Sequence, residues 1–76
     1  MSMYLNKSGK SGIREYDIGN DYIIVHFKSG NKRHYRYDYS KPGQIHVEKM
    51  KQLALLGEGL NSYISTTVKK NYSSCW

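Results

Sequence analysis

Cysteine, acidic residues and long apolar runs are all scarce in this chain of 76 residues. The single cysteine, Cys75, excludes an intramolecular disulfide, so the fold gains nothing from an oxidising compartment. The N-terminal stretch lacks the apolar segment of a secretion signal, and no run approaches the roughly 20 apolar residues of a membrane-spanning helix. We therefore expect a cytoplasmic protein that has no membrane partner.

The shortage of acidic residues leaves a strong positive charge. Six Asp and Glu stand against twelve Lys and Arg, which gives a net charge of +6. The excess is concentrated in residues 26–41, where five basic residues face Asp38 alone, a net charge of +4. Such a cluster favours a polyanionic partner, nucleic acid first and an anionic surface second. The alternative is a solvated surface that only keeps the protein soluble.

The residue sets of common enzymes are also missing. The chain has no paired carboxylates and no Gly-rich phosphate loop, and Cys75 has no histidine nearby in the sequence. His26 and His34 could be neighbours, but without a thiol or carboxylate partner they fall short of a zinc site. A chain of this length also has a small core. The sequence therefore predicts a protein with no catalytic residues, no metal and no cofactor.

Local patterns predict an α+β domain over residues 13–70, between a flexible basic tail at 1–12 and a C-terminal tail at 71–76. Segments 13–18, 22–28 and 32–39 have the β-branched and aromatic composition of strands, with a turn at 29–31. We expect an antiparallel sheet of three to four strands, covered on one face by one main helix and a short second helix.

The main helix is expected from Gln44 to Gly57. Ser40 is the candidate N-cap, and Pro42 fits the first turn. Apolar residues then recur at intervals of three and four, and Gly57 has the place of a C-terminal cap.

The stretch "KRHYRYDY" (32–39) places tyrosines at alternate positions. A three-residue turn at 29–31 would pair Val25 with Tyr35 and Ile23 with Tyr37, so that both tyrosines are mostly buried against the helix residues Met50 and Leu53. The opposite face then offers basic and aromatic side chains on which unpaired bases could stack. Alternatively, this face of the sheet binds nothing and is simply a polar surface exposed to water. The candidate nucleic-acid-binding residues are Tyr22, His26, Lys28, Lys32, His34 and Arg36.

The order of short motifs resembles the KTSC domain, a module found at the C-terminus of some lysyl-tRNA synthetases and as stand-alone bacterial proteins. The resemblance covers roughly residues 12–65. It departs from the family pattern in a short first strand and in a longer link into the helix. It implies an α+β fold, and RNA binding is the function suggested for the family. The residues that carry it are Phe27, Ser29, Gly30, Tyr35, Tyr37, Ala54, Gly57, Asn61 and Ile64.

Two functions from different classes follow as expectations. The first is a small non-enzymatic nucleic-acid-binding module, for RNA or single strands, that uses the basic and aromatic sheet face. The second is a protein–protein interaction module, such as a small inhibitor or accessory subunit, that docks on an acidic protein through the same surface. We expect a monomer or a weak homodimer in either case.

Overall fold

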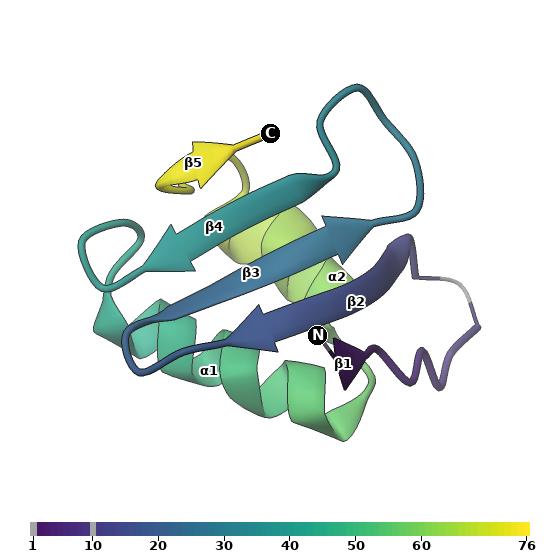
Figure 1. Cartoon of the computed structure of the whole chain (residues 1–76). Coiled ribbons are helices and arrows are strands. Elements are labelled where there is room, and N and C mark those ends of the chain that lie inside the picture. The colour runs from purple at the N-terminus through teal and green to yellow at the C-terminus, as the bar shows by residue number, and fades with distance from the viewer. Residues whose placement is uncertain (1, 10) are drawn as a thin grey trace.

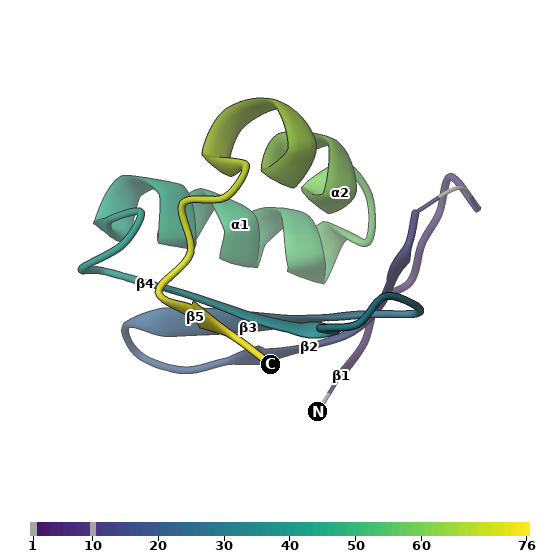
Figure 2. The same ribbon diagram turned by 90° about the horizontal axis from the view of Figure 1, so that it is seen from above.

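The computed structural model describes residues 2–9 and 11–76 of the chain. Five antiparallel strands form one sheet in chain order, and the helices cover one of its faces (Figures 1 and 2). The predicted α+β class is confirmed, with a sheet one strand larger than expected. The elements are β1 (Ser2–Met3), β2 (Ile13–Ile18), β3 (Tyr22–Phe27), β4 (His34–Asp38), α1 (Gln44–Leu56), α2 (Leu60–Tyr63), the π-helical turn η1 (Ile64–Val68) and β5 (Ser74–Cys75).

The central hairpin has the register that its hydrophobic pattern predicts. Ile23 pairs with Tyr37 and Val25 pairs with Tyr35 across β3 and β4. A slip by one residue would turn every one of these side chains away from the helices, so burial fixes the pairing. Tyr37 is 1% exposed. Tyr35 differs from the expectation, because it lies half-buried at the rim of the core.

The core lies between the sheet and the helices. On α1, the buried residues are Val47, Met50 and Ala54, whose spacing of three and four places them on one side of the helix. Leu60 of α2 is also fully buried. No helix among the described residues is long and apolar enough to cross a membrane.

The two ends of α1 are built differently from each other. The helix begins after Gly43 rather than Ser40, whose hydroxyl donates to Asp38 Oδ1 at 2.6 Å in the preceding turn. The other end is as predicted. Gly57 has a φ of 84°, and its N–H donates to the carbonyl of Leu53. A Cβ atom at Gly57 would lie 2.5 Å from that of Leu5, so both backbone and space require glycine here.

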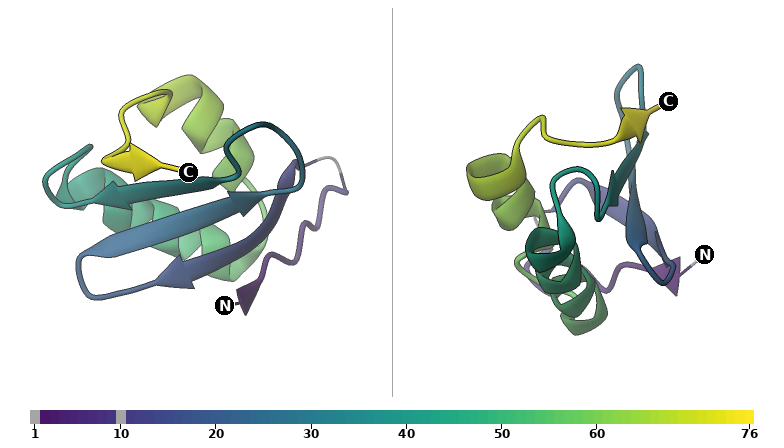
Figure 3. Two further views of the ribbon diagram at one scale, coloured as in Figure 1. Left: turned by 45° about the horizontal axis from the view of Figure 1, so that its top comes forward. Right: turned by 90° about the vertical axis from the view of Figure 1, so that its left-hand side faces the viewer.

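Both terminal segments are part of the sheet, in place of the tails expected at 1–12 and 71–76. β1 pairs with β2 at one edge and β5 pairs with β4 at the other (Figure 3). Tyr4 is buried, and its hydroxyl accepts a hydrogen bond from the N–H of Leu60 at 3.3 Å. The edges of a three-stranded sheet expose unpaired backbone groups, and these short strands satisfy them. Met1 and Lys10, also within the predicted N-terminal tail, lie outside the described residues.

Candidate nucleic-acid interface

Four of the six predicted binding residues lie together on the sheet face that points away from the helices. Tyr22 is on β3 opposite Asp38, and His26 on β3 pairs with His34 on β4. Arg36 shares this face, because side chains two residues apart on a strand point to the same side. The structure therefore assembles this part of the predicted surface.

Arg36 and Tyr22 make close contacts within the protein. The guanidinium carbon of Arg36 lies 4.4 Å above the centre of the Tyr22 ring. Its Nε also donates to Asp38 Oδ2 at 3.2 Å. Both the charge and the planar surface of Arg36 thus already have partners.

The two histidines are similarly engaged. His26 is 6% exposed, and its Nε2 lies 3.1 Å from Asp17 Oδ2. The His34 ring stacks on Trp76, with centroids 5.4 Å apart and an angle of 3° between the planes. Its centroid is also 4.4 Å from that of His26, edge to face. Trp76 therefore covers one face of the His34 ring, while Trp76 itself is 51% exposed.

The charge of this open face is not basic. Glu15 on β2 pairs with His26, and Asp17 pairs with Ile24, so both carboxylates belong to the same face. Together with Asp38 they give three carboxylates, which balance Arg36 and the two arginines, Arg14 and Arg33, that line a hollow with Glu15, His26 and His34. The alternation of Glu15 and Asp17 in "IREYDI" (13–18) is the sequence signal for these acidic side chains.

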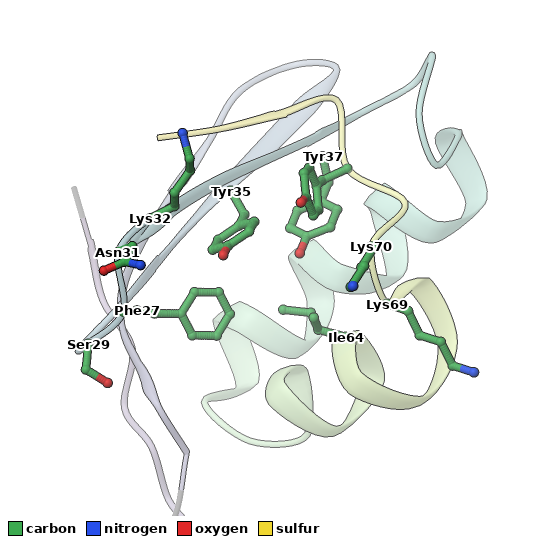
Figure 4. Close-up of a pocket in the computed structure, with 11 residues that line it drawn as sticks. Phe27, Ser29, Asn31, Lys32, Tyr35, Tyr37, Ile64, Lys69 and Lys70 are labelled. Atoms are coloured by element: carbon green, nitrogen blue, oxygen red, sulfur yellow. The ribbon is translucent and has the colours of Figure 1, made fainter.

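Lys28 and Lys32 are exposed and lie outside the four-residue cluster. Lys32 lines a cavity of about 500 Å³ between the β3–β4 turn, β4 and the C-terminal part of the helical layer (Figure 4). The residues around this cavity are Phe27, Ser29, Gly30, Asn31, Lys32, Tyr35, Tyr37, Ile64, Lys69, Lys70 and Tyr72.

Four aromatic rings line the cavity. Phe27 meets Tyr35 edge to face, with centroids 5.4 Å apart, and Tyr35 meets Tyr72 in the same way at 5.0 Å. Burial raises the pKa of Tyr37 far above its usual range, and a hydrogen bond with Cys75 raises the pKa of Tyr72. These tyrosines are therefore neutral at physiological pH. Tyr37 is almost fully buried, so the ring surface open to a ligand comes from Phe27, Tyr35 and Tyr72.

Three lysines surround these rings. Lys70 extends toward the aromatic cluster and Lys69 points away from it, while Lys32 lies on the opposite side (Figure 4). None of the described residues that line the cavity is Asp or Glu. Within the part of the chain that the structure describes, these lysines form no ion pair. A concave surface with charge of one sign concentrates counter-ions, here anions.

An unusual backbone conformation positions two of the lysines. Lys69 has a φ of 50° and a ψ of −119°, a backbone conformation that residues other than glycine rarely adopt. Its N–H donates to the carbonyl of Ile64 at 2.6 Å, which closes η1. Both strained residues and π-helical turns are frequent at functional sites. The conformation turns the chain back toward β4, with Lys70 extended toward the rings and Lys69 pointing away from them.

The cavity and its rim are the candidate site, and its chemistry is that of aromatic rings and lysines. Among the described residues, no group of three or more His, Cys, Asp or Glu side chains is placed to hold a metal ion. Comparisons with protein-family models, curated proteins and solved structures found no match to this chain. The protein is therefore classified by its fold and its candidate site alone, as a small α+β domain with an aromatic cavity bordered by lysines.

Proposed function

We propose that this chain is a small, non-enzymatic nucleic-acid-binding module that binds single-stranded RNA or DNA. The observation that carries the proposal is the cavity, where four aromatic rings and three lysines meet without a carboxylate. The resemblance to KTSC domains supports the same function, and a cytoplasmic location belongs to this proposal. Lys32 stays in the proposed site. The open-face residues Tyr22, His26, His34 and Arg36 are left out of it, because their partners lie within the protein.

A single strand suits this site better than a duplex does. Unpaired bases expose the faces that stack on aromatic side chains, whereas a duplex hides them and offers mainly phosphates. The lysines stand around the rings rather than in an extended stripe, so a strand could place its phosphates on Lys70 while its bases approach Tyr35. Stacking tolerates every base, so we expect weak sequence preference.

A titration of fluorescently labelled single-stranded oligonucleotides tests this function. Affinity should fall as the salt concentration rises from about 50 to 200 mM, because bound lysines release counter-ions from phosphates. Replacing Lys32 or Lys70 with Ala should weaken binding. Each replacement should flatten the logarithmic salt slope by about 0.7, the value for one phosphate contact to a single strand.

Matched variants locate the site. Lys49→Ala removes one exposed positive charge from α1, away from the cavity, and should leave the affinity almost unchanged. Arg36→Ala should also have little effect on affinity if the open face is not used. Absence of binding at about 50 mM salt would contradict the proposed function. Loss of binding in Arg36→Ala alone would return the site to the open face.

A second candidate, a protein-docking module, is favoured by exposed apolar side chains near the end of α1. Leu5, Leu55 and Leu56 are 67%, 66% and 49% exposed, and Ile18 lines a hollow together with Leu55. Exposed apolar patches often mark protein interfaces. Sedimentation measurements would detect docking of a second copy, which Leu55→Glu should abolish without changing oligonucleotide affinity.

A further inference from the structure

We propose that the cavity is a subsite for one unpaired nucleobase, inserted against Phe27 and Tyr35 while its phosphate stays at the lysine rim. This inference rests on the proposed function and specifies how the strand is held. It predicts that affinity has two separable parts, one from phosphates and one from a single base.

The size of the cavity sets the number of bases. Its volume of about 500 Å³ lies within the range of about 300–1,000 Å³ typical of sites for small molecules. An open hollow of this volume has room for about one nucleotide unit rather than for a run of stacked bases. The remaining bases of the strand would stay outside, in water.

The walls match the chemistry of a base. Phe27, Tyr35 and Ile64 offer apolar surface and converge from the sheet and from the helical layer (Figure 4). Phe27 and Tyr35 are half-buried, so part of each ring is still open to a ligand. Stacking on such rings needs no particular base edge.

The rim matches the polar parts of a nucleotide. Ser29 and Asn31 lie in the β3–β4 turn on one side of the cavity, and their side chains can hydrogen-bond to a sugar or a base edge. Lys70 lies on the other side, where its ammonium can meet a phosphate. Because no carboxylate lines the cavity, the ligand approaches without like-charge repulsion.

Three single-stranded octamers separate the two contributions: one with all bases, one with abasic sites throughout, and one abasic except for a central 2-aminopurine. In the wild-type protein the single-base octamer should bind about 5- to 150-fold more tightly than the abasic one, the range for one base on an aromatic ring. Stacking should also quench the 2-aminopurine fluorescence, a readout that needs no variant.

Phe27→Leu keeps an apolar side chain but removes one of the two rings, so it should clearly lower the affinity ratio, because only Tyr35 is left to stack on the base. Tyr22→Leu is the matched control, because it removes an aromatic ring from the open face, and it should leave the ratio unchanged. Lys70→Ala should weaken the abasic and single-base octamers by the same factor.

Three results would have different meanings. Equal, salt-sensitive binding of abasic and single-base octamers to the wild-type protein, without quenching, would overturn the base subsite and leave the proposed function intact. Failure of the octamer with all bases to bind at about 50 mM salt would overturn both. A ratio that Phe27→Leu leaves unchanged and Tyr22→Leu abolishes would move the base to the open face.

Discussion

Two tyrosines on the same strand, Tyr35 and Tyr37, show how much one residue's position decides its role. Both point to the helical side of the sheet, as the alternating pattern predicts. Both rings line the cavity, but Tyr37 is fully buried, whereas Tyr35, nearer the start of β4, is only half-buried. The sequence pattern gives the face of a side chain but not its distance from the centre of the core.

The difference in burial predicts a difference in stability. Tyr37→Ala should lower the free energy of unfolding by about 3–5 kcal/mol, the usual loss for a large aromatic removed from a core. Tyr35→Ala should cost clearly less, because its ring is partly solvated already. Urea denaturation of both variants measures this. An equal or larger loss for Tyr35→Ala would contradict the burial described above.

Asp38 links stability to pH. Hydrogen bonds from Ser40, the largest cause, and from Ser73 and Arg36 lower its pKa from 3.8 to about 2, against the opposing effect of burial. A carboxylate with a depressed pKa in the folded state stabilises the protein above its unfolded-state pKa. Asp38 should therefore stabilise the fold fully above about pH 4 and lose this effect progressively toward about pH 2.

Acid unfolding of Asp38→Asn tests this linkage. The stability difference between wild type and variant should be largest near neutral pH and should shrink as the pH falls below about 4. Ser40→Ala, which removes one donor and keeps the carboxylate, should reduce the pH dependence less. A difference that stays constant between pH 6 and 2 would rule out this role for Asp38.

Among the elements, those with their own local pattern could be predicted and those that depend on distant partners could not. β2, β3, β4 and α1 have distinctive composition or periodicity, and Gly57 marks the end of the helix. β1 and β5 have only two residues each, and they form because the neighbouring strand edges need partners. Nothing in the terminal sequences themselves indicates a strand.

The backbone of the turn after η1 is strained, and a substitution can measure how much this strain lowers stability. Lys69→Gly should stabilise the fold, because glycine relieves about 1–3 kcal/mol of backbone strain and costs about 0.5–1 kcal/mol in chain entropy. Thermal unfolding should show a higher Tm for Lys69→Gly, while Lys70→Gly, at a residue without a positive φ, should give no gain. A lower Tm for Lys69→Gly would mean that the conformation carries no strain.

At the scale of the whole molecule, the distribution of charge could be predicted only in part. The basic residues of segment 26–41 are close together in the sequence, but in the folded protein they lie on different surfaces. Arg36 is neutralised by Asp38 on the open face, whereas Lys32 joins Lys69 and Lys70, nearly forty residues later, at the cavity. The candidate site therefore depends on chain reversal at the end of η1, which no local motif announces.

Amide chemical-shift mapping of the ¹⁵N-labelled protein with an unlabelled single-stranded octamer, at about 50 mM salt, tests the binding site most directly. We expect saturable shifts at Phe27, Tyr35, Ile64 and Lys70, with little change at Asp17 and Ile24 on the open face. Shifts confined to the open face, or no shifts at any residue, would contradict the proposed binding site.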